Sequence, residues 1–182
     1  HGEMMGDHRM LGKGGFFPQS YHIPLVVKLP GTGAGGRVEA FTSATDVFPT
    51  LAEAMGVAPR HAPDGRSLLP FLRGGTPSDW RQAALWECDL RHAMDPAALG
   101  MAPRDCVVQC RMDDRHLYVT SPGWASALYD LGSDPGCLHN RADAPAFQAA
   151  RLAAAEALLT DRARAMDDTL ARACVWDWHA TR

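Results

Sequence analysis

The second half of the chain constrains the fold most, because it carries short strand-like runs followed by one long helix-forming stretch. The runs are Ala84–Cys88, Cys106–Arg111, His116–Thr120 and Leu128–Leu131. Residues 112–115 separate the middle two runs, which therefore predict a hairpin. Residues 146–173 are rich in alanine and contain neither glycine nor proline, which predicts a helix. A series of strands followed by one long helix indicates a small α+β unit.

The first half contains one apolar run between two glycine-rich segments. Ile23–Leu29 is apolar and β-branched at three positions, which predicts a buried strand. Residues 1–15 are too polar and too rich in glycine for a helix, and residues 30–36 carry four glycines, so both predict loops. This half has the character of a remnant of a larger α/β unit.

Residues 45–55 predict a helix within the same half. Thr45 or Asp46 can cap its start, and Gly56 ends it. The apolar residues that recur at a spacing of four, and so form one stripe along the helix, are Val47, Leu51 and Met55.

Composition excludes several classes of function. The 182 residues are 46% apolar and 21% charged, as in an ordinary globular protein that buries a core. The net charge of −3 gives no reason to expect a nucleic-acid or anionic-membrane partner. No run approaches the eighteen apolar residues of a membrane span.

The five cysteines are odd in number and irregularly spaced, and no Cys-x-x-Cys pair suggests a zinc site. We expect scattered buried thiols in a reducing compartment, so the cytoplasm is the favoured location. The compartment stays open, because the sequence starts on His1 and a signal peptide before it would not be seen. The same start predicts that the chain is the C-terminal part of a longer protein, cut inside an active-site segment.

The N-terminal segment holds the residues best suited to chemistry. His1, His8 and Lys13 lie within thirteen residues, among glycines that let backbone approach a ligand closely. A single histidine is more often structural than a ligand. Neither the His-Glu-x-x-His pattern nor the Pro-Cys-x-x-Cys of zinc deaminases completes a known zinc site here.

The order of residues in this segment resembles a known family. His-Gly-Glu-x-x-Gly-Asp-His, then Gly-Lys, then Ser-Tyr-x-Ile-Pro-Leu, over residues 1–25, is similar to the second metal-site segment of the sulfatases. Within that alkaline-phosphatase-like superfamily, the segment is most similar to the branch of phosphonate monoester hydrolases and arylsulfatases.

Three further motifs follow in the family's order. Residues 45–51 resemble its Asp-x-x-Pro-Thr-Leu helix, and residues 64–70 resemble its Asp-Gly-x-Ser-Leu-x-Pro loop. Residues 128–141 resemble Leu-Tyr-Asp-Leu-x-x-Asp-Pro-x-Glu-x-x-Asn-Leu, with Cys137 and Arg141 in place of the glutamate and the last leucine. Four motifs in order make chance agreement improbable.

The resemblance implies the fold class and its division. We expect an α/β protein, the C-terminal part of an alkaline-phosphatase-like sulfatase fold. Residues 1–80 would retain part of the large mixed sheet of the catalytic domain. Residues 81–182 would form a small antiparallel-sheet subdomain with a closing C-terminal helix.

The resemblance also implies an activity and roles for three residues. The complete enzyme would hydrolyse sulfate esters, or phosphonate and phosphate esters, with a hydrated formylglycine nucleophile and a divalent cation. His1 matches a metal-ligand position. Lys13 matches the lysine that binds substrate and neutralises its oxygens during catalysis. His8 matches a position in or behind the catalytic pocket.

The imidazole of His1 favours Mn²⁺ over Ca²⁺, with Mg²⁺ and Zn²⁺ as alternatives. The partner would be a small-molecule sulfate, phosphonate or phosphate ester, and self-assembly into a homo-oligomer would fit the family. Nothing points to nucleic acid.

One departure is serious. Formylglycine is made from the first residue of Cys/Ser-x-Pro-x-Arg, and no such run occurs here; Ser133–Cys137 comes nearest. We therefore expect the isolated chain to be inactive, with Ile23–Leu29 left as an open, aggregation-prone edge. The alternative is an inactive relic, or a non-enzymatic interaction module that uses the tryptophan-rich tail at residues 176–179.

Overall fold

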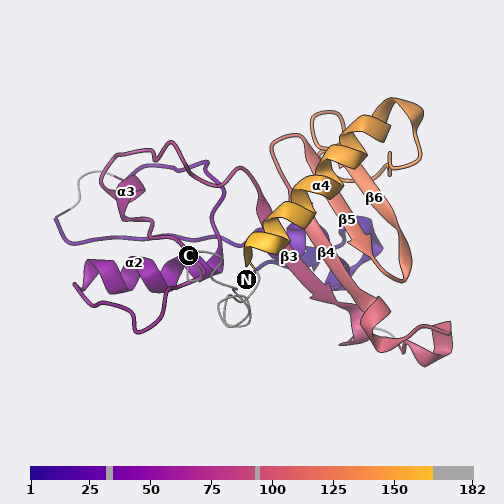
Figure 1. Ribbon diagram of the computed structural model, residues 1–182, viewed down its shortest axis with the longest axis horizontal. Coiled ribbons are helices and arrows are strands. Elements are labelled where there is room, and N and C mark those ends of the chain that lie inside the picture. The colour runs from indigo at the N-terminus through magenta and orange to yellow at the C-terminus, as the bar shows by residue number, and fades with distance from the viewer. Residues whose placement is uncertain (32–34, 93–94, 166–182) are drawn as a thin grey trace, which may run out of the picture.

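The computed structural model describes residues 1–31, 35–92 and 95–165 of the chain (Figure 1). Its centre is a four-stranded antiparallel sheet in the order β3-β4-β5-β6. The strands are β3 (Ala84–Asp89), β4 (Val107–Met112), β5 (His116–Ser121) and β6 (Trp124–Asp130). All four predicted strands and the hairpin are confirmed, although β6 begins at Trp124, before the predicted run.

The alternation of side chains along these strands gives the sheet two apolar faces. On one face, Tyr118 and Leu128 are buried beneath helix α4 (Gln148–Ala165), which contributes Ala154 and Leu158. Figure 1 shows α4 lying across the sheet. The predicted helix is confirmed up to residue 165, and its continuation to residue 173 lies outside the described residues.

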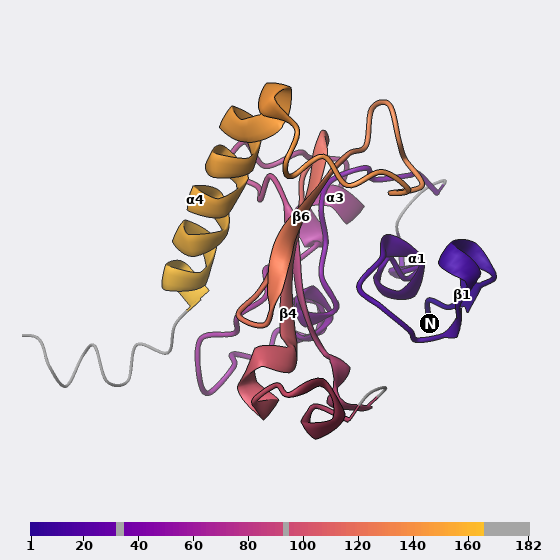
Figure 2. The same cartoon turned by 90° about the vertical axis from the view of Figure 1, so that its right-hand side faces the viewer.

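The opposite face of the sheet is covered by residues 1–21. These form a small hairpin of β1 (Met4–Met5) and β2 (Leu11–Gly12), a 3₁₀ turn at Asp7–Arg9, and the short helix α1 (Pro18–Tyr21). Figure 2 shows the sheet between α4 on one side and this segment on the other. The loop predicted for residues 1–15 is therefore wrong where the hairpin forms.

Residues 1–21 pack closely on the sheet. The side chains buried at this contact include Met4, Phe17, Leu117, Val119 and Tyr129. Trp86 Nε1 donates to the Phe16 carbonyl at 3.1 Å, and the Tyr21 ring stacks on Trp86. The N-terminal segment thus packs on the sheet formed by residues 84–130. The division near residue 80 stays a prediction.

The strand predicted at Ile23–Leu29 is not present. The backbone there is irregular, and most of the segment is exposed to solvent. A buried strand requires neighbouring strands that bond its backbone groups, and the two sheets of the described residues do not include this segment.

The helix predicted over residues 45–55 is confirmed as α2 (Val47–Ala54), preceded by a 3₁₀ turn at Ala44–Asp46. Its cap differs from the prediction. Ser43 caps the turn by accepting the Thr45 N–H, while the Asp46 carboxylate accepts the Ser43 N–H at 2.8 Å. The stripe is also reversed, because Leu51 and Met55 face solvent and Pro49, Thr50 and Ala52 are buried.

The remaining elements are short. They are α3 (Leu69–Leu72) and the 3₁₀ turns at Leu90–His92, Ala97–Leu99, Pro103–Cys106 and Pro145–Phe147. Within the described parts of the chain, none of the helices has the length and apolar character needed to cross a membrane.

Candidate functional site

The β1–β2 hairpin brings the two ends of the first sequence motif together. Met4 pairs with Gly12 in the antiparallel register, so Lys13 and the residues before Met4 lie together beyond that pair. Met4 is fully buried and anchors the hairpin on the sheet. The Glu3 N–H donates to the Gln19 carbonyl at 2.9 Å, which fixes the start of the hairpin against α1.

Lys13 lies against this start. Its ammonium group donates to the His1 carbonyl and, at 3.2 Å, to the Ser20 carbonyl. Gly2 makes the arrangement possible, because it has a φ of +71° and a Cβ at that position would lie 2.3 Å from the Ser20 oxygen. His1 and Lys13, singled out from the sequence, are therefore neighbours.

The His1 imidazole is largely exposed to solvent. Its Nδ1 lies 3.0 Å from the Gly2 carbonyl oxygen and 3.4 Å from Glu3 Oε2. One imidazole and one carboxylate offer at most two ligands to a cation. Across the described residues, no group of three or more His, Cys, Asp or Glu side chains could hold a metal. His1 fits a divalent ion only as one ligand among others supplied from outside these residues.

His8 is placed differently from His1 and Lys13. It takes a left-handed backbone conformation with φ at +52°, and its ring stacks on Phe17 with centroids 3.5 Å apart. Phe17 in turn contacts Tyr129 of the sheet. Among the described residues, no hydrogen bond or ion pair joins His8 to either His1 or Lys13. It therefore belongs to the support of the segment.

The segment also contains buried polar atoms without hydrogen-bond partners. In the described parts of the chain there are four such side-chain atoms: Glu3 Oε2, His8 Nε2, Gln19 Oε1 and Ser20 Oγ. All four lie within residues 3–20. Each buried polar group without a hydrogen bond lowers the stability of the fold by about 1–3 kcal/mol. Their concentration in one segment indicates that a ligand or further polypeptide supplies the missing hydrogen bonds. Gln19 and Ser20 were missed from the sequence, although Ser20 opens the Ser-Tyr-x-Ile-Pro-Leu part of the first motif.

The second and third motifs meet in a cluster that we call the clasp, formed by Asp46, Thr50, Gly65, Arg66 and Arg81. The fully buried Asp46 carboxylate binds the Arg81 guanidinium through both oxygens, at 2.5 and 2.6 Å. It also accepts the Arg66 N–H at 2.8 Å. Burial alone would raise the pKa of Asp46, but these hydrogen bonds lower it below its ordinary value.

Thr50 and Gly65 complete the clasp. Thr50 Oγ1 donates to the Asp46 carbonyl at 2.5 Å and accepts the Leu68 N–H at 2.8 Å. A Cβ on Gly65 would lie 2.0 Å from the Thr45 carbonyl oxygen, so only glycine fits this crossing. The Asp-x-x-Pro-Thr-Leu and Asp-Gly-x-Ser-Leu-x-Pro motifs are therefore two halves of one structural joint.

The fourth motif is structural as well. Asn140 Oδ1 accepts the N–H groups of Leu128 and Ala142, at 3.0 and 2.9 Å. Asp134 Oδ2 accepts the His139 N–H at 2.7 Å. These bonds fold the loop after β6 back onto the strand, and the motif meets the N-terminal segment through the buried side chains of Tyr129 and Cys137.

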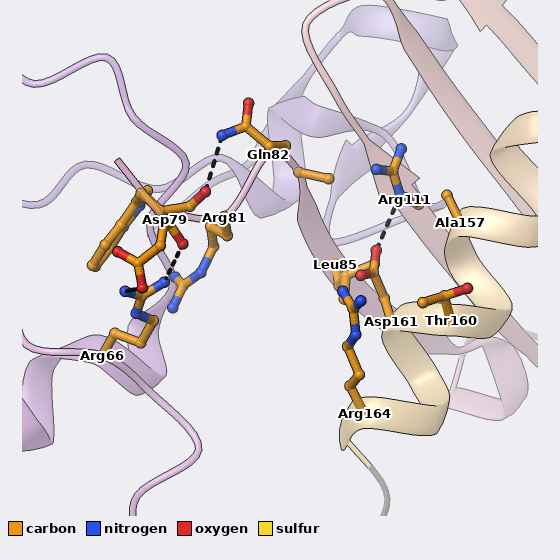
Figure 3. Close-up of a pocket in the computed structure, with 12 residues that line it drawn as sticks. Arg66, Asp79, Arg81, Gln82, Leu85, Arg111, Ala157, Thr160, Asp161 and Arg164 are labelled. Atoms are coloured by element: carbon orange, nitrogen blue, oxygen red, sulfur yellow. Dashed lines mark hydrogen bonds and ion pairs between the residues drawn. The ribbon is translucent and has the colours of Figure 1, made fainter. Parts of the chain in front are cut away.

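An open groove of about 520 Å³ lies between the clasp and α4, away from the hairpin (Figure 3). Its guanidinium groups are largely neutralised within the chain. Arg66 pairs with Asp79 at 2.9 Å, and Arg111 pairs with Asp161 at 3.1 Å. Arg81 pairs with Asp46, which leaves Arg164 as the one lining arginine without an ion pair among the described residues. Because most of its positive charge is neutralised, the groove is a weaker candidate for an anionic substrate than the hairpin.

The four cysteines of the described residues (Cys88, Cys106, Cys110 and Cys137) are buried and free, as predicted, and Cys174 lies outside those residues. Burial raises the pKa of the Cys137 thiol to about 11 and that of the Cys110 thiol further. Burial, with the Cys88 thiol beside it, also raises the pKa of the Tyr21 hydroxyl. The Cys137 and Cys110 thiols and the Tyr21 hydroxyl are therefore protonated at neutral pH and are poor nucleophiles.

Comparison with known proteins matches the whole described fold to one group of hydrolases. Residues 6–164 match the family described as "N-sulphoglucosamine sulphohydrolase, C-terminal". The multifunctional alkaline phosphatase superfamily protein PehA of Trinickia caryophylli is 38% identical over 175 residues, which is 93% of this chain and 34% of that protein. The choline-sulfatase of Rhizobium meliloti is 30% identical over 80% of this chain and 26% of its own length.

Solved structures agree. The phosphonate monoester hydrolase of Agrobacterium radiobacter superposes with a TM-score of 0.85 at 49% identity, over 93% of this chain and 34% of that one. The phosphonate monoester hydrolase SpPMH of Silicibacter pomeroyi gives the same TM-score and coverage at 35% identity. The chain thus spans about a third of the length of these relatives.

Proposed function

The chain belongs to the sulfatase family, within the alkaline-phosphatase-like superfamily, and on that premise we propose that it forms one wall of a hydrolase active site. The substrates of the complete enzyme are sulfate esters or phosphonate and phosphate esters, all of which present a tetrahedral anionic centre. The observation that carries the proposal is the Lys13 ammonium beside His1, in the segment that holds all the buried side-chain N and O atoms of the described residues that lack a hydrogen bond.

Lys13 is the substrate-binding and catalytic residue of this wall. Its ammonium group has three N–H donors, and the carbonyls of His1 and Ser20 use two of them. The third is available to an oxygen of the substrate. Because those carbonyls hold the ammonium in place, it can stabilise the negative charge that builds up in the transition state without reorganising.

His1 is the metal-binding residue. A divalent cation bound there would polarise the substrate and stabilise its developing charge. His1 would give it one imidazole nitrogen, a donor that favours Mn²⁺ over Ca²⁺, with Mg²⁺ and Zn²⁺ as alternatives. For His8, a candidate for the catalytic pocket, we propose a positioning role in the same wall, and its stack on Phe17 supports that role.

The formylglycine-type nucleophile of the family would come from polypeptide outside these 182 residues, since the chain has no Cys/Ser-x-Pro-x-Arg run. We therefore expect negligible turnover of aryl sulfates and phenylphosphonate esters by the isolated chain. Robust metal-dependent hydrolysis by the isolated chain would contradict this division of labour.

A chimeric enzyme tests the proposal. In the phosphonate monoester hydrolase of Agrobacterium radiobacter, the matched third is replaced by this chain, and kcat/KM is measured on phenylphosphonate and aryl sulfate esters. We expect Lys13→Ala to lower kcat/KM about 10²–10³-fold. His1→Ala should lower the bound metal, measured by elemental analysis.

The control for charge is Arg104→Ala, because Arg104 is an exposed cation far from the hairpin in sequence. It should leave both kcat/KM and metal content unchanged. A folded, active chimera in which Lys13→Ala has no larger effect than Arg104→Ala would overturn the proposed role of Lys13.

A further inference from the structure

The Glu3 carboxylate lies close to His1 and to Gly12, the residue before Lys13. Its Oε2 is 3.4 Å from His1 Nδ1. Its Oε1 is 3.8 Å from the position that a Cβ on Gly12 would occupy. Among the described residues, the ion pair of Glu3 is with His1 and not with Lys13. The carboxylate is therefore directed at the imidazole that the proposed function assigns to the metal.

The backbone holds Glu3 firmly in this place. Its N–H donates to the Gln19 carbonyl at 2.9 Å, and the next residue, Met4, is fully buried and pairs with Gly12. The Glu3 side chain is 38% exposed, yet its Oε2 is buried and accepts no hydrogen bond. A buried carboxylate oxygen without a donor lowers stability, so the needs of the hairpin do not explain Glu3.

The surroundings of the His1 ring distinguish its two nitrogens. Nδ1 lies 3.0 Å from the Gly2 carbonyl oxygen and 3.4 Å from Glu3 Oε2. A carbonyl oxygen and an ionised carboxylate can only accept a hydrogen bond, so Nδ1 is the nitrogen that carries the proton. The lone pair of the neutral ring is then on Nε2, which makes Nε2 the atom that can bind a cation.

A carboxylate beside the other nitrogen is what a metal-binding histidine normally has. The ring N–H that faces away from the metal donates to a carboxylate or a carbonyl, which fixes the tautomer and the orientation of the ring. Glu3 Oε2 is not placed to bind the same ion, because it lies at Nδ1 and the two ring nitrogens point in different directions. A contact of 3.4 Å is long for a hydrogen bond, and such contacts often shorten when the site is filled.

We infer that Glu3 is a positioning residue of the metal site, whose carboxylate accepts the Nδ1–H of His1 and so presents Nε2 to the divalent cation. The inference rests on the proposed function and deepens it, because it assigns the binding atom of His1 and the group that orients the ring. Lys13 acts on the substrate, whereas Glu3 acts only through His1.

Metal affinity of the same chimera tests the inference without using turnover. The metal is removed with a chelator, and Mn²⁺ is added while the electron paramagnetic resonance signal of unbound Mn²⁺ is followed. We expect Glu3→Ala to raise the Kd for Mn²⁺ about 10–100-fold. Glu3→Gln should raise it less, because an amide oxygen still accepts the Nδ1–H. Glu156→Gln is the matched control, since Glu156 is an exposed glutamate on α4, and it should leave the Kd unchanged.

The dependence of kcat on Mn²⁺ separates positioning from catalysis. At saturating Mn²⁺, kcat of the Glu3→Ala chimera should return close to that of the unmodified chimera, because Glu3 does not touch the substrate. Lys13→Ala should stay slow at every Mn²⁺ concentration. The unfolding midpoint of the metal-free Glu3→Ala chimera should match that of Glu156→Gln, which shows that the loss of affinity does not come from misfolding.

Three results would overturn the positioning role. The first is a Kd for Mn²⁺ in Glu3→Ala equal to that of Glu156→Gln. The second is a Kd in Glu3→Gln raised as far as in His1→Ala, because Glu3 would then be a direct ligand. The third is a kcat of Glu3→Ala that stays low at saturating Mn²⁺.

The outcome for His1 distinguishes this inference from the proposed function. If His1→Ala abolishes Mn²⁺ binding while Glu3→Ala has no effect, His1 keeps its proposed role and only the positioning role of Glu3 is lost. If His1→Ala leaves the Kd unchanged, the proposed metal-binding role of His1 fails and the role of Glu3 fails with it.

Discussion

The clasp and the N-terminal hairpin both carry family motifs, but they treat their polar groups in opposite ways. In the clasp, the Asp46 carboxylate is fully buried and accepts four hydrogen bonds from Ser43, Arg66 and Arg81. In the hairpin segment, four buried side-chain N or O atoms have no hydrogen-bond partner within the described residues. A motif whose groups are satisfied inside the chain stabilises the fold, whereas one with unpartnered groups is completed from outside.

This contrast distinguishes structural residues from candidate catalytic residues, which the resemblance to a family does not do. Asp46 and Lys13 match family motifs equally well, and both are charged. Asp46 has both oxygens occupied by groups of its own chain, while Lys13 retains a donor after its two carbonyl contacts. The contacts of Asp46 indicate a role in stability, whereas the catalytic role of Lys13 is our proposal.

The largest expected effect comes from removing one carboxylate from each region. Asp46→Ala should lower the free energy of unfolding by about 3 kcal/mol, because it leaves the Arg81 guanidinium and two N–H groups without their acceptor. Glu3→Ala should cost less than about 1 kcal/mol, since Glu3 Oε2 accepts no hydrogen bond. Urea denaturation of the two variants measures the difference. Equal losses of unfolding free energy in the two variants would contradict the difference between the clasp and the hairpin.

Glycines give the next largest contrast. Gly65→Ala should cost about 2 kcal/mol or more, because its Cβ meets the Thr45 carbonyl at 2.0 Å and forces the two halves of the clasp apart. At Gly12, with φ at +77°, the nearest atom to a Cβ is Glu3 Oε1 at 3.8 Å. Gly12→Ala therefore faces only backbone strain of about 1 kcal/mol. Thermal unfolding of both variants checks the order, and a reversed order would place the tighter crossing in the hairpin.

Acid should destabilise the clasp. The folded-state pKa of Asp46 lies below its ordinary value of 3.8, so its contribution is complete above that value and is lost as pH falls through the folded pKa. The pKa of Asp113 is lowered as well. Burial raises it, but the hydrogen bonds that the Asp113 carboxylate accepts from the N–H groups of Arg115 and His116 have the larger combined effect. We expect a drop in the unfolding midpoint below about pH 4 that is smaller in Asp46→Asn. An unchanged pH profile in that variant would contradict it.

The sequence predicted the sheet and α4 well because their signals are local. Strand alternation, the turn at residues 112–115 and an alanine-rich stretch without glycine or proline each act within a few residues. The errors at Ile23–Leu29 and at the α2 stripe share one physical cause. Both patterns are those of buried elements, and burial depends on a covering layer that the described residues do not contain.

The candidate site was predicted in part. The spacing from His1 to Lys13 suggested one cluster, and the hairpin brings these two residues together. No sequence pattern indicates that the His8 ring stacks on Phe17, because that contact depends on a left-handed backbone at His8 itself. Ser20 contributes through its carbonyl, a group that every residue possesses, so no side-chain pattern could reveal it.

The smallest expected effect on stability is that of a substitution at His8. This substitution tests whether His8 acts with the hairpin or with the clasp. His8→Phe keeps an aromatic ring to stack on Phe17 and removes the buried, unpartnered Nε2, which should gain stability. Phenylalanine also tolerates a φ of +52° less well than histidine, which should cost a similar amount. The two changes oppose each other, so the free energy of unfolding should stay within about 1 kcal/mol of the unmodified chain. If the imidazole positions the wall of the active site, kcat of the chimera should still fall in His8→Phe while its unfolding midpoint does not. A stability loss as large as that of Asp46→Ala would instead place His8 with the clasp, as a residue that the fold itself requires.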